Sequence, residues 1–456
     1  MKYFSLNYNA RDVGFLEAVR KGLAPDRGLY FPKQIPKLEQ DFINNLNKYS
    51  DHEIAYEVIK QYVGDDISSN DLKKIIQDTL SFNFPIIEIT DKIALLELFH
   101  GPTLAFKDIA MQLLGNFYEY YLSNENQKIN IVVATSGDTG AAAIDAIKGK
   151  KNVNIFVLHP ENRVSLVQRK LMTTVKYKNV FNIAVRGNFD DCQNLVKSMF
   201  SDKNFSNEIN MSGVNSINWA RIIAQSVYYF YSYFLVKYED QPTNFSVPTG
   251  NFGDVYAGYL SKKLGLPINK LIVATNQNDI LHRAISKGSY QAEKVSETIS
   301  PSMDIQVASN FERLIFDLNN EDDVQTSQDM RIIKEIGKYV LDDQKLNKIN
   351  ENFLSARISE KETLEIISSV YNQFNVVLDP HTAIGYGAFD KHNLIGNNIV
   401  LGTAHPSKFP DAIFRAIKTN ADLPSELKFI LNEKENYDTI ENDVEKVKQH
   451  IKDRIQ

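Results

Sequence analysis

Lys107, within the stretch of residues 97–114, is the side chain with the clearest chemical potential. Gly101-Pro102 predicts a turn, and Thr103 is a good N-cap for a following helix. Lys107 then falls in the first turn of that helix, where the helix dipole disfavours a cation. Its neighbours at helical spacing are mostly apolar, so burial also favours the neutral amine, which is a nucleophile toward a carbonyl carbon. A lysine whose stem passes apolar residues to reach water gives the same pattern.

Three polar loops, each directly after an apolar stretch that predicts a strand, could hold an anion or a polar ring atom. They span residues 135–140, 248–254 and 402–410, and the first two are rich in glycine. In parallel α/β sheets, ligands bind where the carboxyl ends of strands lead into helix N-termini. Each loop alone is equally typical of an ordinary turn. In the third loop, His405 could be a structural histidine and Lys408 a solvated lysine.

One lysine, a glycine loop and a hydroxyl at a strand end are the groups that a cofactor with an aldehyde, a phosphate and a ring nitrogen requires. The combination points to pyridoxal phosphate. A nucleotide is disfavoured, because the sequence has no G-x-G-x-x-G motif and no Walker lysine after its glycine loops. No Cys/His cluster or H-E-x-x-H motif predicts a metal site.

The elements that must position these groups alternate between strand and helix patterns from residue 131 to about 236 and again from 244 to 418. This rhythm predicts a parallel sheet with helices on both faces. We expect an α/β fold of two open, twisted, mostly parallel sheets flanked by helices, with the pyridoxal phosphate between the domains. The expected strands of the second part include residues 244–247, 271–274, 376–378 and 398–401.

We expect two domains. Residues 93–236 form the small α/β domain that carries Lys107, and residues 237–456 form the large one. The helical segment 1–92 belongs to the large domain, which also contains a polar, helical insertion at about 288–360. The charged tail from Leu427 is expected to be a solvated helix.

Composition limits the class of partner. The 456 residues include 57 acidic and 51 basic side chains, a net charge of −6, which argues against nucleic-acid binding. No apolar run is long enough to cross a bilayer, and the N-terminus lacks the apolar core of a signal peptide. The single Cys192 excludes an internal disulfide framework and fits a reducing compartment. We therefore expect a cytoplasmic enzyme with a small-molecule substrate and no membrane partner.

Residues 100–108, His-Gly-Pro-Thr-Leu-Ala-Phe-Lys-Asp, resemble the cofactor-lysine motif of threonine synthases, which are pyridoxal-phosphate enzymes of the tryptophan-synthase-β-like fold type II. Further stretches are similar to motifs of that family, in the family's order. They are residues 28–32, 134–140, 247–253, 378–383 and 402–406. The resemblance runs from about residue 20 to about 420. The length and the insertion are more similar to the enterobacterial and yeast branch than to the plant branch.

The resemblance implies a role for each matched residue. Lys107 would bind the cofactor aldehyde and later move protons between substrate carbons. Thr403 would hydrogen-bond the pyridine nitrogen. The cofactor phosphate would be held by the backbone amides of Gly250, Asn251, Phe252 and Gly253. The ring edge and the substrate carboxylate would be faced by Ser136, Gly137, Asp138 and Thr139. Many fold relatives have Asn at the position of Asp138, so its role toward the cofactor hydroxyl is left open.

The family's substrate is O-phospho-L-homoserine, and the reaction is the last step of threonine biosynthesis. The α proton and then a β proton are removed, phosphate leaves the γ carbon, and water adds at the β carbon. The leaving phosphate requires cationic and hydroxyl partners. We predict a phosphate clamp from two clusters that open helices in matching regions. Its members are Arg163, Ser165, Gln168, Arg169, Asn215, Ser216, Asn218 and Arg221. A surface ion pair explains each arginine equally well.

Two alternatives stay open. The first is another β-eliminating lyase that uses the same cofactor, such as a serine or threonine deaminase, which would release ammonia and a 2-oxo acid. The second is a non-catalytic, regulatory protein that binds pyridoxal phosphate. It would keep Lys107 and the glycine loop but would not need the arginine clusters. The resembled branch implies a monomer, and a homodimer is left open.

Overall fold

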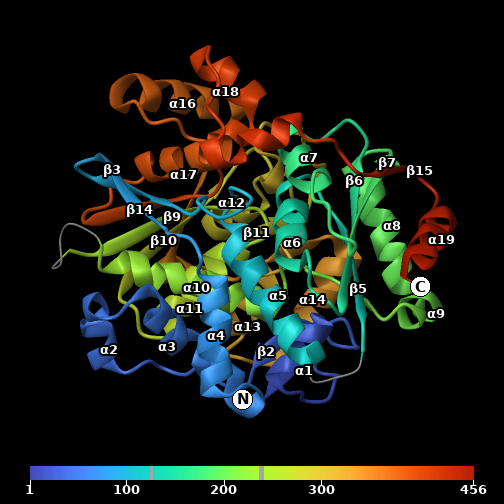
Figure 1. Cartoon of the computed structure of the whole chain (residues 1–456). Helices are drawn as coiled ribbons and strands as arrows, with labels where there is room; N and C mark the ends of the chain where they lie inside the picture. The colour runs from blue at the N-terminus through green and yellow to red at the C-terminus, as the bar shows by residue number, and fades with distance from the viewer. Residues whose placement is uncertain (124–126, 236–240, 456) are drawn as a thin grey trace.

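Two sheets lie side by side in the protein (Figure 1). This is seen in a computed structural model, which describes residues 1–123, 127–235 and 241–455. The six-stranded sheet has the order β13-β10-β9-β14-β4-β3, and the five-stranded sheet has the order β15-β7-β6-β5-β8. Every pairing within them is parallel except the hairpin of β3 and β4. The expected α/β class, with two mostly parallel sheets flanked by helices, is confirmed.

The central strands are buried along almost their whole length, which is why they form continuous apolar runs in the sequence. The six-stranded sheet consists of β13 (Phe353–Arg357), β10 (Ile268–Thr275), β9 (Thr243–Pro248), β14 (Asn397–Gly402), β4 (Ile93–Glu97) and β3 (Ile86–Thr90). The five-stranded sheet consists of β15 (Asp438–Glu441), β7 (Val180–Arg186), β6 (Val153–Pro160), β5 (Ile129–Ala134) and β8 (Met211–Ser212).

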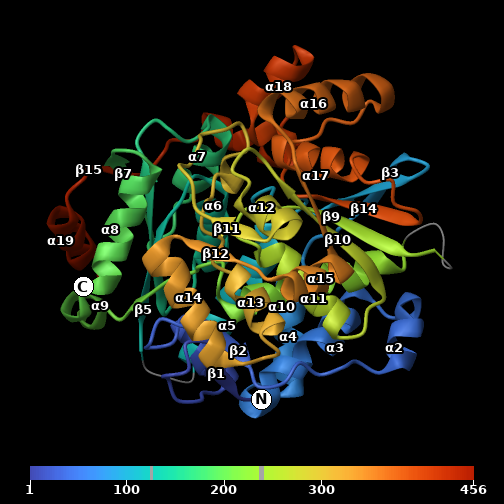
Figure 2. The same cartoon turned by 180° about the vertical axis from the view of Figure 1, so that it is seen from behind.

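Helices cover both sheets, and the packing of α5 against α6 and α10 joins the two halves (Figures 1 and 2). Beside the five-stranded sheet are α5 (Lys107–Ser123), α6 (Asp138–Ile147), α7 (Leu166–Thr173), α8 (Phe189–Ser201), α9 (Lys203–Glu208) and α19 (Val444–Ile455). Beside the six-stranded sheet are α10 (Trp219–Tyr233), α11 (Gly253–Lys263), α12 (Ile280–Lys287), α16 (Glu360–Phe374), α17 (Pro380–Asp390) and α18 (Pro410–Ile417).

The N-terminal segment is helical, as expected, but it also contains one short antiparallel pair of strands. Its elements are β1 (Tyr3–Ser5), α1 (Phe15–Lys21), β2 (Tyr30–Pro32), α2 (Gln40–Asn44), η1 (Leu46–Lys48), α3 (Asp51–Val63), η2 (Gly64–Asp66) and α4 (Ser69–Thr79). Here η denotes a 3-10 helix. Helix α3 begins with a capping box of Ser50 and Glu53.

The insertion is more than a surface addition, because its last strand, β13, becomes the edge of the six-stranded sheet next to β10. The insertion contains β11 (Ser289–Gln291), η3 (Pro301–Met303), α13 (Phe311–Leu318), α14 (Asp323–Ile336), β12 (Lys338–Val340) and α15 (Asp343–Asn352). Two 3-10 helices follow near the C-terminus, η4 (Pro406–Lys408) and η5 (Ser425–Asn432).

Two sequence expectations about local structure are wrong. Residues 376–378 are not a strand, because they are a short connection between the left-handed Asn375 that ends α16 and the Asp379 that caps α17. The tail is not only a solvated helix. Its strand β15 pairs with β7, and Val447 and Ile451 of α19 are fully buried against the core that contains Cys192.

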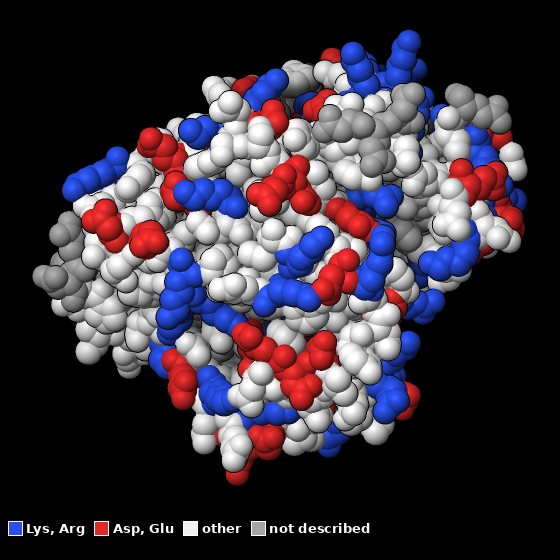
Figure 3. Space-filling view, turned by 90° about the horizontal axis from the view of Figure 1, so that it is seen from below, with Lys and Arg blue, Asp and Glu red and all other residues white. Residues whose placement is uncertain are grey.

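The sheets also differ from the expected division of the chain. Strand β4, expected in the small domain, pairs with β14 in the six-stranded sheet, and β15, expected in the large domain, belongs to the five-stranded sheet. The expected boundary at residues 236 and 237 falls in 236–240, outside the described residues. On the face seen in Figure 3, acidic and basic side chains are interspersed, in line with the near balance of charge in the sequence.

Candidate active site

Lys107 is the first residue of α5, and its side chain is buried. The turn before it is held by Asp108, whose carboxylate accepts hydrogen bonds from the hydroxyl and the backbone N–H of Thr103, the latter at 2.9 Å. Thr103 was expected to cap the helix with its hydroxyl, and this is wrong because that hydroxyl donates to Asp108 instead. Burial raises the pKa of Asp108 to about 6, although the bonds from Thr103 act to lower it.

The carboxylate of Asp138, at the start of α6, is the centre of the polar contacts around Lys107. Its Oδ2 lies 3.4 Å from Lys107 Nζ and 3.3 Å from the Ser302 hydroxyl. Its Oδ1 lies 2.6 Å from Lys408 Nζ and accepts from Gln168 Nε2 at 2.9 Å. Segments far apart in the sequence therefore meet at one carboxylate.

The electrostatics of this cluster favour an ionised Asp138 and a weakly basic Lys107. Burial by itself raises the pKa of Asp138, but Lys408 and then Lys107 outweigh it and hold that pKa well below its ordinary value. Burial also lowers the pKa of Lys107, and the nearby charges of Lys408 and Arg221 lower it further, while Asp138 acts in the opposite sense. A lysine in this environment gives up its proton more readily than a solvated one.

Thr403 follows β14, and its backbone is fixed from two sides. Its N–H donates to the Thr382 hydroxyl at 3.0 Å, and its carbonyl accepts from the Phe106 N–H at 2.9 Å. Its own Oγ1 is buried and finds no hydrogen-bond partner among the residues that the structure describes. Because a buried hydroxyl without a partner is costly, the orphaned atom fits a partner supplied by a ligand, such as a ring nitrogen.

The glycine loop after β9 leads directly into α11. Phe252 adopts a left-handed conformation with φ 63°, which turns the chain into the helix. For the part of the chain described, no hydrogen-bond acceptor is found for the backbone N–H groups of residues 250–253. A side chain at Gly250 would bring Cβ to 3.0 Å from the Met303 Cα, so the backbone needs glycine there. Free amides at a helix N-terminus form a cradle for a phosphate.

The structure brings several predicted substrate residues to this cluster. Gln168 bonds to Asp138, and the Ser165 hydroxyl donates to the Lys408 carbonyl at 2.8 Å. Ser216 lies at the glycine loop instead, where its hydroxyl accepts from the Asn251 amide. In the S-G-D-T-G loop, Ser136 and Thr139 are half-buried. Gly137 has φ 139°, and a Cβ there would lie 2.7 Å from the Gln168 side chain.

The three predicted arginines and asparagines of the clamp that are not exposed, Arg169, Asn218 and Arg221, have different contacts. Arg221 is buried, and its Nε has no partner within the described ranges, while its Nη1 donates to the Val214 carbonyl at 3.0 Å. Arg169 instead forms a two-pronged ion pair with Glu435, at 2.8 and 3.2 Å, so the ion-pair interpretation holds for it.

The remaining members are not brought to the cluster. The oxygen of Asn218 caps α10, and its amide donates to the Val19 carbonyl at 2.7 Å, so both polar atoms are engaged in structural bonds. Arg163 and Asn215 are exposed. For these three residues, the structure offers no contact with Lys107 or Asp138.

Three residues of the cluster were missed. Lys408, for which a solvated position was one of the open interpretations, is fully buried. Ser302 lies in the insertion, and its backbone N–H donates to His381 Nε2 at 3.2 Å. The ring of His381 is in turn 2.8 Å from Asp379 Oδ1. The sequence signal for His381 was its place in the matched stretch 378–383, whereas nothing in the local sequence marks Ser302.

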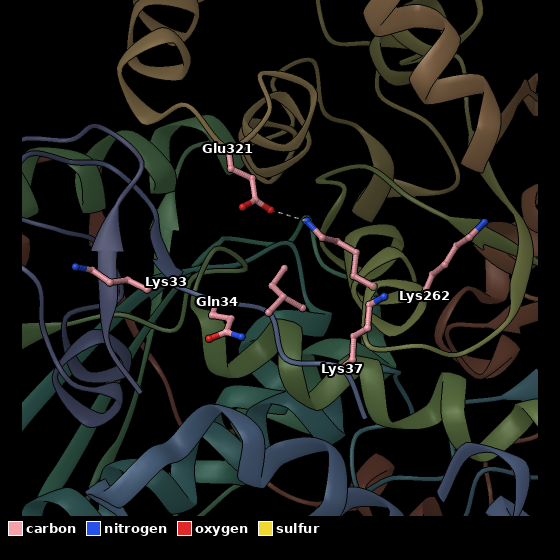
Figure 4. Close-up of a pocket in the computed structure, with 7 residues that line it drawn as sticks. Lys33, Gln34, Lys37, Lys262 and Glu321 are labelled. Atoms are coloured by element: carbon pink, nitrogen blue, oxygen red, sulfur yellow. Dashed lines mark hydrogen bonds and ion pairs between the residues drawn. The ribbon is translucent and has the colours of Figure 1, made fainter. Parts of the chain in front are cut away.

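A cavity of about 460 Å³ lies away from these residues (Figure 4). It is lined by Lys33, Gln34, Ile35, Lys37, Lys262, Lys263 and Glu321, and Lys263 pairs with Glu321 across it. Lys262 and Lys263 end α11, while the glycine loop begins it, so the two regions are about 15 Å apart along the helix. The cavity is not part of the candidate site.

Comparison with known protein families indicates the same class of protein as the geometry of the site. The family model described as pyridoxal-phosphate dependent enzyme matches residues 88–402, which span Lys107, the glycine loop and the end of β14. The chain is therefore a pyridoxal-phosphate-dependent enzyme of fold type II. Two further models, threonine synthase N terminus and threonine synthase, C-terminal, match residues 2–80 and 382–451. The chain belongs to the threonine synthase family.

Similar proteins cover the whole chain. The threonine synthase of Pseudomonas aeruginosa is 42% identical, over 99% of this chain and 98% of its own. The solved structure of pyridoxal-phosphate-bound threonine synthase from Brucella melitensis has a TM-score of 0.96 at 42% identity, over 100% of both chains. The yeast threonine synthase structure has a TM-score of 0.94 at 40% identity, over 100% of this chain and 98% of its own.

Proposed function

We infer that the chain catalyses the threonine synthase reaction, in which O-phospho-L-homoserine and water give L-threonine and phosphate. The observation that carries this inference is a family relationship that extends over the full chain and includes every loop around Lys107. Pyridoxal phosphate fits the site, because the orphaned Thr403 hydroxyl, the free amides of residues 250–253 and the buried Lys107 match its ring nitrogen, phosphate and aldehyde. When bound, this cofactor supplies an electron sink for the negative charge left by proton removal.

Lys107 is the proposed catalytic residue. Its amine would hold the cofactor through the aldehyde, and the same amine would act as a base whenever it is free. The free amine takes a proton from the α carbon and one from the β carbon. It returns one proton to the γ carbon, which becomes a methyl group, and one to the α carbon of the product. A base that serves neighbouring carbons must stay near neutrality between transfers. Burial at the start of α5 supports this role, since it lowers the pKa of the amine.

The proposed phosphate site is built around Arg221. The bond between the γ carbon and the bridging oxygen breaks, and the phosphate leaves with that oxygen and both electrons. The hydroxyl of water adds at the β carbon, and the other proton of the water goes to the departing phosphate. Among the residues that the structure describes, the buried guanidinium of Arg221 has no carboxylate partner, which suits it to the charge of the leaving group. The burial of Arg221 and its nearness to Lys107 support this assignment. Ser216 and Gln168 are the neutral donors next to it in the proposal.

We also propose the organisation of the protein. The smaller domain is centred on the five-stranded sheet and carries Lys107, and substrate draws it toward the larger domain. The protein acts as a monomer in the cytoplasm, and its single buried cysteine supports a reducing compartment. In the part of the chain described, no helix has the length and apolarity needed to cross a membrane. Light scattering of the purified protein tests the oligomeric state.

A product assay tests the proposed reaction. Purified protein with O-phospho-L-homoserine is expected to release phosphate and L-threonine in equal amounts. Ammonia and 2-oxobutyrate as main products would instead establish the deaminase alternative. Cofactor absorbance without any turnover would establish the binding-protein alternative.

A further inference from the structure

Lys408 is a second lysine in the site, and it is more deeply buried than Lys107, with 0% of its surface exposed against 8%. It ends η4, which begins three residues after Thr403. Its Nζ lies 2.6 Å from Asp138 Oδ1 and donates to the Thr103 carbonyl at 2.9 Å. Lys107 approaches the other oxygen of the same carboxylate, at 3.4 Å. One buried carboxylate thus lies between two lysines.

The contacts of the two lysines are unequal. A distance of 2.6 Å is that of a strong, charge-assisted hydrogen bond, whereas 3.4 Å is at the outer limit of a hydrogen bond. Lys408 has two oxygen acceptors at short distance, while both hydrogen bonds of Lys107, to Asp138 and to Ser302, are 3.4 Å long. A buried ammonium group is stable only where it is paired and hydrogen-bonded. Lys408 meets that condition better than Lys107.

We propose that Lys408 is the permanent counter-ion of Asp138 and is thereby a positioning residue that leaves the Lys107 amine free to give up its proton. The carboxylate can then hold Gln168 and the Ser302 hydroxyl in place without holding a proton on Lys107. In a chain without Lys408, Lys107 would be the nearest cation to Asp138, and the carboxylate would stabilise the protonated amine. The proposal rests on the proposed role of Lys107 as the catalytic base.

Other charged and titratable groups surround the pair. They are Asp108 on α5, Arg221 on α10, Asp379 and His381 at the start of α17, and His405 before η4. Burial lowers the pKa of His405 to about 4, so this ring is neutral at physiological pH. Lys408 acts to lower the pKa of Lys107, whereas Asp138 acts to raise it, and the two influences oppose each other as the proposal requires.

The test compares four variants of the full-length holoenzyme: Lys408→Met, Lys408→Arg, Asp138→Asn and the double variant Asp138→Asn/Lys408→Met. Lys391→Met, which removes an ion-paired surface lysine 2.9 Å from Glu362, is the matched control. Two pH profiles are recorded for each, the absorbance of the bound cofactor and kcat/KM for O-phospho-L-homoserine. Thermal melting reports folding.

Lys408→Met is expected to move both midpoints upward by about one pH unit or more, because the uncompensated carboxylate raises the pKa of the Lys107 nitrogen. Lys408→Arg keeps the charge and is expected to keep the midpoint of the absorbance profile. The double variant removes both charges and is expected to return the midpoints to within about half a unit of the parent protein. Lys391→Met should leave both profiles unchanged.

Unchanged profiles in Lys408→Met would overturn the proposal, and so would a double variant whose midpoints stay displaced. If Lys408→Met fails to fold, the midpoints of the double variant are the deciding measurement, and midpoints that stay displaced from those of the parent protein overturn the proposal. The proposed function fails separately: a parent protein that forms no threonine would refute that function, while the absorbance profile would still decide the role of Lys408.

Discussion

The backbone N–H of Ser302 donates a hydrogen bond to Nε2 of His381 at 3.2 Å. Since Nε2 is the acceptor, the ring proton is on Nδ1, which donates to Asp379 Oδ1 at 2.8 Å. This chain of contacts ties the insertion to α17 and holds the Ser302 hydroxyl between Lys107 and Asp138. The insertion at about residues 288–360, which the sequence did not connect with the site, therefore forms one side of it.

His381→Ala should remove the hydrogen-bond acceptor of the Ser302 N–H and so leave the Ser302 hydroxyl less well positioned. We expect kcat for threonine formation to fall by about tenfold, because a misplaced hydroxyl beside the base weakens positioning, while the cofactor still binds. His381→Gln retains an acceptor for the Ser302 N–H and should recover most of the loss. Steady-state kinetics and cofactor absorbance check this, and equal losses in the two variants would show that the bond to Ser302 is unimportant.

Thr403→Val and Thr382→Val should differ in their effect on the free energy of unfolding of the cofactor-free protein. The Thr403 hydroxyl has no partner among the described residues, so its removal should leave the free energy of unfolding unchanged or raise it. The Thr382 hydroxyl bonds to Asp379 and accepts from the Thr403 N–H, so its loss should cost about 1–3 kcal/mol.

Thr403→Val should lower the affinity for the cofactor, although it does not lower the stability of the cofactor-free protein. The reason is that valine has no hydroxyl to bond to the ring nitrogen of pyridoxal phosphate. Denaturant unfolding without cofactor and equilibrium titration with it measure the two effects. A Thr403→Val protein that binds the cofactor as tightly as the parent would remove Thr403 from the site.

Arg221→Met and Arg163→Met separate two of the three arginines that the sequence placed in the phosphate clamp. Arg221 is buried and near enough to Lys107 for its charge to lower the pKa of that lysine, whereas Arg163 is exposed. We expect Arg221→Met to raise KM for O-phospho-L-homoserine by about 10- to 100-fold, the loss of one charge-assisted contact, and Arg163→Met to change it little. A larger effect at Arg163 would move the clamp to the start of α7.

Asp254 should make the stability of the protein depend on pH. Burial raises its pKa from 3.8 to about 7, although hydrogen bonds from Tyr228 and Tyr229 act to lower it. Between these two pH values the folded state holds a proton that the unfolded state has released. The contribution of Asp254 to stability is therefore full below about pH 4 and is lost as the pH rises toward 7.

Asp254→Asn imitates the protonated carboxyl and should remove this loss. The variant should gain stability relative to the parent as the pH rises from 4 to 7, with a slope approaching about 1.4 kcal/mol per pH unit. Denaturant unfolding of the cofactor-free proteins at several pH values measures the difference. A difference that does not change with pH would mean that Asp254 is ionised throughout that range.

Local sequence was sufficient for the parts of the site that are local in the chain. A glycine loop between a strand and a helix can be recognised from a few consecutive residues. Lys107 and the loops at residues 135–140 and 248–254 could be predicted for this reason. The α/β class followed in the same way from the alternation of strands and helices, because burial on both faces leaves a continuous apolar run.

Contacts between distant segments could not be predicted in this way. Lys408 is buried only because Thr103, Asp138 and Ser165 surround it, and no pattern near residue 408 records those neighbours. Strand β15 depends likewise on its pairing with β7, far earlier in the chain. Asn218 suited a polar clamp by type, but the fold used it to cap α10 and to hold α1.

The central claim is that this chain breaks the bond between carbon and oxygen in O-phospho-L-homoserine and adds water at the neighbouring carbon, with Lys107 as the base. Mass spectrometry of the products formed in ¹⁸O-labelled water tests it most directly. We predict label in the hydroxyl of L-threonine, none in the phosphate, and no product from Lys107→Ala. Label in the phosphate, with homoserine as the other product, would contradict the account.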